Sequence, residues 1–141
     1  SLGIGQRVTF QGAVSSHQMP QELARLDTLV LPSLTRSRWK EQFGRVLVEA
    51  MACGVPVVGS DSGEIPNVIG PAGMVFPEGN AGALRERLAQ LMADPEMRKD
   101  LSQRGRERVE ALYTQKQVAE STYEMYLRIL DGELERTSPP W

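Results

Sequence analysis

The chain has 141 residues, of which 40% are hydrophobic and 24% are charged, and its formal net charge at pH 7 is −2. This length predicts one domain with a modest core, and the absence of a basic excess argues against a nucleic-acid-binding module. A single cysteine excludes an intrachain disulfide and a thiolate metal cluster, a single histidine excludes a His-rich metal site, and no apolar run reaches the about 20 residues of a membrane span.

Short apolar runs alternate with helical patterns along the sequence. In chain order, the expected elements are a strand over Arg7–Phe10, a short helix over Gln21–Leu26, a strand over Thr28–Leu31, a polar loop over Ser33–Phe43, a helix over Gly44–Cys53, a strand over Pro56–Gly59, a short helix over Ile65–Ile69, a strand over Met74–Phe76, and three helices over Ala81–Ala93, Pro95–Leu112 and Gln115–Leu134. Gly54 is expected to end its helix in a left-handed cap, and Pro56 prevents continuation.

Two of the later helices show apolar stripes at helical spacing. The stripe of the helix over Ala81–Ala93 consists of Leu84, Leu88, Leu91 and Met92. In the last helix, the residues expected to face inward are Val118, Thr122, Met125, Ile129 and Leu130. Both stripes predict packing against a core.

Near-continuously apolar strands joined by helices indicate a parallel sheet covered on both faces, which is a Rossmann-like, doubly wound α/β fold. Ligands of such sheets bind beyond the carboxyl ends of the strands, here the loops after Phe10, Leu31 and Gly59. Four strands are few for this class, so we expect the first strands of the domain to be missing and its exposed sheet edge to allow self-association. We expect one partial domain over residues 1–135 and a flexible tail over residues 136–141.

The segment from Glu41 to Glu49 carries the most informative chemistry. Seven residues separate the two carboxylates; Glu41 lies in the loop before a helix and Glu49 lies one to two turns into it. The backbone N–H groups of Gly44, Arg45 and Val46 are expected to be free at the helix N-terminus, where they suit a phosphate. The spacing alone fits equally two solvated carboxylates, one of which caps a helix.

The residues around this segment favour a ligand site over two solvated carboxylates. The segment resembles the E-x7-E motif of the family 4 retaining glycosyltransferases, which have the two-domain GT-B fold. Four further stretches resemble runs of that family at the family's spacing, and they are Val8–Gly12, Leu29–Ser33, Glu49–Val58 (EAMACGVPVV) and Ser60–Ile69 (SDSGEIPNVI). The resemblance covers most of the chain from Arg7 to about Met92.

This resemblance implies roles for the residues that match the motif. Glu41 would contact the transferred sugar near the reacting carbon, and Glu49 would accept hydrogen bonds from the ribose hydroxyls of the donor. The other donor-binding positions, which act through backbone N–H groups, would be Phe43, Gly44, Arg45 and Val46. The implied reaction transfers a sugar, with retained configuration, from a nucleoside-diphosphate sugar to a glycan, lipid or small-molecule acceptor through an oxocarbenium-like transition state.

The resemblance also implies that no metal or other cofactor is needed, and the sequence contains no Asp-x-Asp. It further implies that the chain is the C-terminal, donor-binding part of a larger cytoplasmic enzyme. Peripheral attachment to a membrane through the N-terminal acceptor domain stays open. No signal peptide opens the sequence. Without the acceptor domain, this fragment is expected to be inactive.

Three departures from the family pattern bear on these roles. Gln42 stands where the family often has glycine, and Arg45 stands where an apolar residue is common. The family's basic pair, an Arg and a Lys early in the donor domain, has no counterpart here. The positive charge for a diphosphate is therefore not accounted for by the motif.

Two other functions remain open at the level of the sequence. One is a sugar-nucleotide 2-epimerase of the same fold, and the EAMACGVPVV run argues against it. The other is a non-catalytic binding or assembly module, which fold alone does not exclude. Retention of Glu41 and Glu49 argues against that module.

Overall fold

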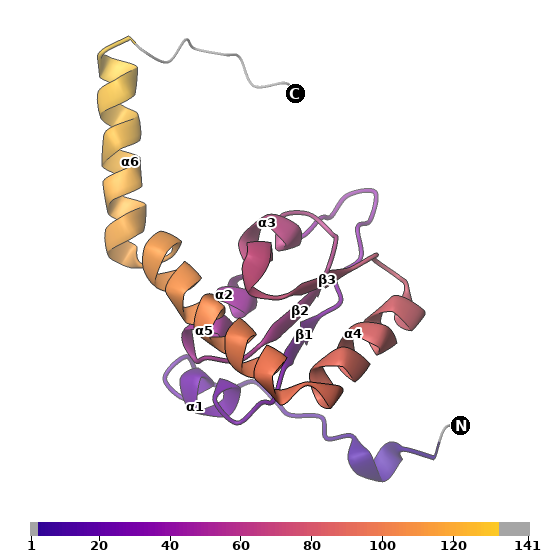
Figure 1. Cartoon of the computed structure of the whole chain (residues 1–141). Helices are drawn as coiled ribbons and strands as arrows, with labels where there is room; N and C mark the ends of the chain where they lie inside the picture. The colour runs from indigo at the N-terminus through magenta and orange to yellow at the C-terminus, as the bar shows by residue number, and fades with distance from the viewer. Residues whose placement is uncertain (1–2, 133–141) are drawn as a thin grey trace.

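A parallel sheet of three strands lies at the centre of the chain, whose computed structural model describes residues 3–132 (Figure 1). The strands are β1 (Leu29–Leu31), β2 (Val57–Ser60) and β3 (Met74–Phe76), and their spatial order is β1-β2-β3. Val58 of the central strand is paired with Val30 on one side and Met74 on the other. All four residues of β2 are buried, as expected of a strand covered on both faces.

Helices connect and follow the strands. They are η1 (Gly5–Arg7), α1 (Met19–Leu23), α2 (Arg45–Ala52), α3 (Ile65–Ile69), η2 (Gly70–Ala72), α4 (Ala81–Ala93), α5 (Pro95–Leu112) and α6 (Gln115–Leu130). Side-chain caps explain where two long helices begin, because Asn80 and Asp94 accept hydrogen bonds from the N–H groups of Ala83 and Met97, each at 2.9 Å. The expected bounds of α4 and α5 are confirmed.

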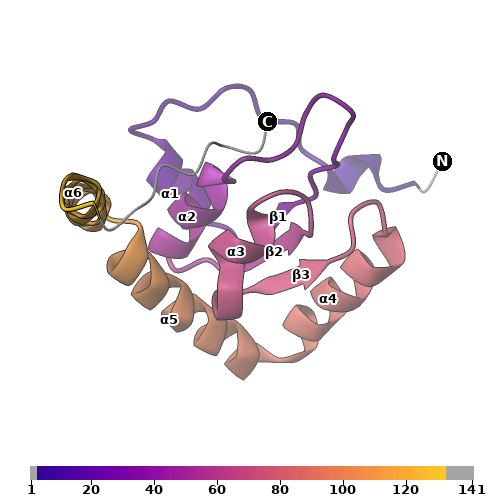
Figure 2. The same cartoon turned by 90° about the horizontal axis from the view of Figure 1, so that it is seen from above.

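The core forms one layer on each face of the sheet. Val57 packs with residues of α1, α2 and α3, whereas Val58 packs with residues of α4 and α5. Figure 2 shows α2 and α3 on one side of the strands and α4 on the other. Neighbouring side chains of one strand therefore serve opposite layers, and the expected α/β sheet covered on both faces is confirmed.

Helix α2 owes its bounds to two glycines in the left-handed conformation. Gly44, with φ of 74°, precedes its first residue, and Gly54, with φ of 75°, follows its last turn as expected. The side chains of Leu47, Ala50 and Met51 are fully buried on one face of the helix. This face fixes α2 against β1 and β2, so its N-terminus lies at the edge where those parallel strands end.

The strand expected over Arg7–Phe10 is not formed. Arg7 ends the 3-10 helix η1, residues 8–15 have no regular structure, and Phe10 is 93% exposed. Within residues 3–132 no strand lies beside this segment to supply ladder hydrogen bonds, so its apolar residues have nothing to pair with. The described chain therefore has three strands rather than four.

Two smaller expectations also differ from the structure. Helix α1 spans Met19–Leu23 instead of Gln21–Leu26. Met92 is 80% exposed, although the rest of the α4 stripe packs on the core as expected.

The inward stripe expected on the last helix is wrong, because no residue of α6 is buried. Figure 1 shows α6 extending away from the sheet, so its apolar side chains have no layer to pack against in the described chain. Helix α6 ends at Leu130. The expected end at Leu134 and the tail over residues 136–141 lie outside the described residues.

Within residues 3–132, no helix is both long and apolar enough to cross a bilayer. Strands β1 and β3 form the two edges of the described sheet. Self-association through such an edge stays a prediction.

Candidate functional site

The Glu41 carboxylate is held at the N-terminus of α2. Its Oε1 accepts a hydrogen bond from the Gly44 N–H at 3.0 Å, and its Oε2 accepts one from the Ser33 hydroxyl at 3.3 Å. Both donors are neutral, so the negative charge of Glu41 is oriented without being cancelled by a cation. The side chain thus bonds the N-cap residue of the helix and lines a hollow beyond it.

A second loop closes against the backbone of Glu41. The N–H of Glu64 donates to the Glu41 carbonyl oxygen at 3.1 Å. Gly63, with φ of 61°, lies so close that a Cβ built on it would stand 1.8 Å from the same oxygen. A glycine is therefore required at position 63 by both its conformation and its neighbour.

The loop after β1 is fastened by groups that sequence reasoning missed. The fully buried Ser60 hydroxyl donates to the Ser33 carbonyl at 2.7 Å, and the hydroxyls of Ser62 and Thr35 are hydrogen-bonded at 2.9 Å. The Thr35 N–H donates to Glu78 Oε2 at 2.8 Å. The only sequence signal for these contacts is that Ser33, Ser60 and Ser62 lie in the stretches with family resemblance. Nothing along the chain links Thr35 to Glu78.

This anchoring changes the titration of Glu78. Hydrogen bonds from Thr35, first from its backbone N–H and then from its side chain, hold the pKa of Glu78 below its ordinary value. Ser62 and the positive charge of Lys40 act in the same direction. The ionised form of Glu78 is therefore the form that fastens the loop.

The N-terminus of α2 is only partly free. The Gly44 N–H, expected to be available, is occupied by Glu41. The N–H groups of Arg45 and Val46 make no hydrogen bond within residues 3–132, and they are the first two of the helix. These two groups remain able to bind an anion at the positive end of the helix dipole.

Glu49 lies on the outer face of α2 and forms an ion pair. Arg45 Nε donates to Glu49 Oε1 at 2.8 Å, while the side chain of Arg45 is 83% exposed and that of Glu49 is 34% exposed. Such an exposed pair contributes little, about 0.3–0.5 kcal/mol. Both residues line a hollow of about 530 Å³ whose other walls come from Ala52 and Cys53, from α1 and from the segment before α1.

Phe43 and Val46 face other parts of the fold. The Phe43 ring packs edge-on against Tyr113, with ring centroids 5.7 Å apart, and the Val46 side chain packs on the core. Neither side chain lines the hollows around Glu41 or Glu49. Any contact that these two positions make with a ligand in those hollows would come from the backbone, as the motif implies.

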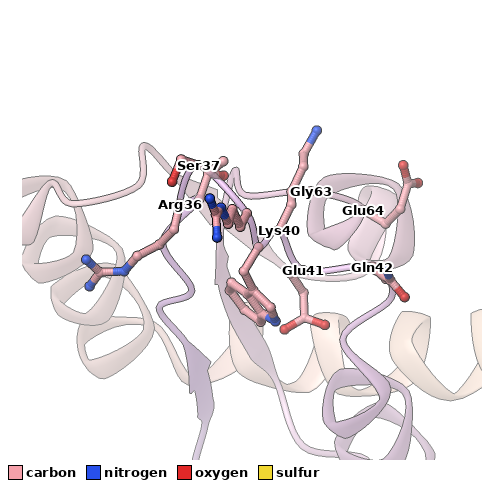
Figure 3. Close-up of a pocket in the computed structure, with 10 residues that line it drawn as sticks. Arg36, Ser37, Lys40, Glu41, Gln42, Gly63 and Glu64 are labelled. Carbon is pink, nitrogen blue, oxygen red and sulfur yellow. The ribbon is translucent and has the colours of Figure 1, made fainter. Parts of the chain in front are cut away.

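The hollow around Glu41 measures about 620 Å³ (Figure 3). Its walls are the loop over residues 35–42, together with Gly63 and Glu64. The structure therefore brings Glu41, Gly44 and Arg45 to one end of α2, and Glu41 and Glu49 line two separate hollows.

No group of three or more His, Cys, Asp or Glu side chains within residues 3–132 is arranged to hold a metal ion. The expectation of catalysis without a metal stays a prediction, since it concerns the reaction rather than the geometry of this chain.

Comparison with known proteins identifies relatives of the whole arrangement. The family model described as "Glycosyl transferases group 1" matches residues 1–108. The chain is 33% identical over 132 residues to N-acetyl-alpha-D-glucosaminyl L-malate synthase of Bacillus anthracis, covering 92% of this chain and 33% of that protein. It is 37% identical over 111 residues to a GDP-mannose-dependent monoacylated alpha-(1-6)-phosphatidylinositol monomannoside mannosyltransferase of Corynebacterium glutamicum, covering 77% of this chain and 29% of that protein.

A solved structure shares the fold. Sucrose-phosphate synthase from Thermosynechococcus elongatus superposes with a TM-score of 0.78 at 32% identity, covering 92% of this chain and 32% of that one. The sheet and its helices thus match those of GT-B glycosyltransferases. The chain spans about a third of the length of the relatives that it matches.

Proposed function

This chain belongs to the group 1 glycosyl transferases, and from that premise we propose that it forms the nucleotide-sugar donor site of a retaining, family 4 enzyme. The acceptor domain would lie in the part of the protein outside this chain, because the chain spans about a third of its relatives' length. The donor-binding role rests on one observation above all. Two carboxylates, Glu41 and Glu49, line separate hollows next to a helix, α2, whose first two N–H groups are free.

The hollow beside Glu49 suits the nucleoside of the donor. Its volume of about 530 Å³ lies within the about 300–1,000 Å³ of ordinary small-molecule sites. A carboxylate is a hydrogen-bond acceptor that matches two neighbouring ribose hydroxyls. The Arg45 guanidinium would have to share Glu49 with the ribose, and the exposed ion pair is weak enough to permit this.

The diphosphate of the donor would lie at the N-terminus of α2. The free N–H groups of Arg45 and Val46 can donate to phosphate oxygens, and the helix dipole favours the charge that develops on the leaving diphosphate. These donors are fixed by the buried face of α2, so they need little reorganisation when the glycosidic bond breaks.

Glu41 would face the transferred sugar. The hydrogen bonds from Ser33 and Gly44 fix the direction of the carboxylate. A fixed negative charge next to the anomeric carbon would stabilise the positive charge of an oxocarbenium-like transition state. This role requires no covalent bond between the protein and the sugar.

We place the enzyme in the cytoplasm as part of the same proposal. A single cysteine, which rules out an intrachain disulfide, is compatible with a reducing compartment.

Kinetics of the intact protein that contains this chain would test the two assigned roles. Glu49→Gln is expected to raise the KM for the donor with little change in kcat, and Glu41→Gln is expected to lower kcat. Glu64→Gln is the matched control, because Glu64 lines the same hollow but is bonded only to Asn67 among side chains. Donor kinetics unchanged in both Glu41→Gln and Glu49→Gln would contradict the proposal.

A further inference from the structure

The loop between β1 and α2 carries three cations within five residues. Arg36, Arg38 and Lys40 all line the hollow beside Glu41, and Figure 3 labels Arg36 and Lys40. The same lining contains two carboxylates, those of Glu41 and Glu64. The hollow is thus one unit positive in a chain whose net charge is −2.

The three cations have no acidic partner of their own. Within residues 3–132 none of them makes an ion pair or a side-chain hydrogen bond, although Lys40 acts through space on Glu78. Glu41 is bonded to neutral donors, and the Glu64 side chain accepts from the Asn67 amide. The two carboxylates of the hollow therefore leave its positive charge available.

Two arginines elsewhere in the chain show the contrast, because their side chains have partners. Arg104 pairs with Asp100 one turn away, and Arg108 donates to the backbone carbonyls of Val68 and Asn67. In Figure 3 the side chains of Arg36 and Lys40 extend away from the Glu41 carboxylate instead of folding onto it. Cations that stand at the rim of a hollow in this way are suited to an anion that comes from outside.

The backbone that presents these cations is held in place. Arg36 and Trp39 form a small bridge through two backbone hydrogen bonds of 2.8 and 3.1 Å. Just before this bridge, Thr35 is anchored to Glu78 and Ser62. Between the cations, Trp39 is 52% exposed and offers an apolar surface next to the charge.

The position of the hollow indicates which substrate the charge would meet, a step that rests on the proposed function. The nucleoside would lie in the hollow beside Glu49, the diphosphate at the N-terminus of α2 and the sugar at Glu41. The basic loop lines the same hollow as Glu41, and that hollow is separate from the one beside Glu49. An anionic group bound there, next to the sugar and apart from the diphosphate, would belong to the acceptor.

We propose that Arg36, Arg38 and Lys40 bind an anionic group, a phosphate or a carboxylate, on the acceptor of the transferred sugar. The two guanidinium groups can bind such an anion through paired hydrogen bonds, and Lys40 adds a point charge. The loop would then select acidic acceptors over neutral ones.

The test uses inorganic phosphate as the probe, titrated at constant ionic strength. The chain carries Trp141→Phe, so that Trp39 is the one tryptophan left in the sequence and its fluorescence reports on the hollow. The loop variant combines Arg36→Gln, Arg38→Gln and Lys40→Gln. The control variant combines Arg85→Gln, Lys99→Gln and Arg104→Gln, which removes the same charge from α4 and α5.

Saturable phosphate binding is expected, weakened roughly tenfold or more in the loop variant and less than about twofold in the control. Equal phosphate affinity in the loop variant and in the chain with the unsubstituted loop would overturn the proposal. The affinities for UDP, GDP and ADP are measured in parallel. The nucleotide that binds should keep its affinity in the loop variant and should not displace phosphate.

Phosphate and that nucleotide could instead compete, and the loop variant could lose affinity for both equally. This result would assign the three cations to the donor diphosphate and overturn the acceptor role. Absence of nucleotide binding in every variant would contradict the proposed function instead. These two failures are distinguishable, because absence of nucleotide binding would not depend on the loop substitutions.

Discussion

Gly63 touches the backbone of Glu41 so closely that a Cβ added to Gly63 would stand 1.8 Å from the Glu41 carbonyl oxygen. The neighbouring Glu64 N–H donates to the same oxygen. The loop after β2 is therefore the wall against which the Glu41 segment is positioned. A side chain at position 63 would disturb Glu41 without altering any polar group of the site.

Gly63→Ala tests this contact. We expect it to lower the free energy of unfolding by roughly 2–4 kcal/mol, since alanine is strained at a φ of 61° and its methyl group would overlap a backbone atom. Urea denaturation measures the change. Gly132→Ala is the control, because Gly132 has a φ of 73° and open space around it. Its cost should be roughly 1–2 kcal/mol, and an equal cost for both variants would show that the contact with Glu41 is not tight.

Ser60→Ala tests the support beneath Glu41. The substitution removes the Ser60 hydroxyl and leaves the Ser33 carbonyl without its donor. We therefore expect the free energy of unfolding to fall by about 1–2 kcal/mol. Because Ser33 also donates to Glu41, the rate of sugar transfer by the intact protein should fall as well.

Ser102→Ala is the matched control for that variant. The Ser102 hydroxyl donates to the Gly54 carbonyl at 2.6 Å, at the other end of α2 from Glu41. It should cost similar stability and leave the transfer rate unchanged. A transfer rate that falls equally in both variants would mean that the effect of Ser60 is general destabilisation.

Glu78 predicts a pH dependence of stability. The pKa of Glu78 is lowered in the folded chain, so its contribution to stability is fully present above the unfolded pKa and is lost as the pH falls through the folded pKa. Urea denaturation at several pH values below the ordinary pKa of 4.5 would measure this loss.

The stability difference between the unsubstituted chain and Glu78→Gln should therefore shrink as the pH falls through this range. Glu86→Gln, which removes an exposed carboxylate of α4, is the control. A difference that stays constant with pH would contradict the anchoring role of Glu78.

The sequence predicts much of the fold because its signals are local. Gly54 and Pro56 mark the end of α2, Asn80 and Asp94 mark the starts of α4 and α5, and the apolar run at Val57 identifies the central strand. Each of these signals acts through its own backbone or its nearest neighbours along the chain.

The failures concern elements whose structure depends on a distant partner. Residues 8–10 have the composition of a strand but no neighbouring strand in the described chain, and α6 has an apolar stripe but no layer beneath it. Local sequence patterns do not reveal whether such a partner is present.

The site shows the same division. The spacing of Glu41 and Glu49 around the start of α2 follows from the sequence, and so does the importance of Gly44. The bond from Gly44 to Glu41, the closing contact of Gly63 and the anchoring of Thr35 by Glu78 depend on loops that meet only after folding.

The most direct test of the donor site is thermal melting of the 141-residue chain with millimolar UDP, GDP and ADP. At about 100 times Kd, a bound nucleotide adds about 2.7 kcal/mol, which should raise the Tm by about 5 °C or more. We predict a rise selective for one base, lost in Glu49→Gln and kept in Glu86→Gln. A shift that survives in Glu49→Gln would contradict the role of Glu49. A cooperative melt that none of the three nucleotides shifts would contradict the claim that this chain holds the donor site.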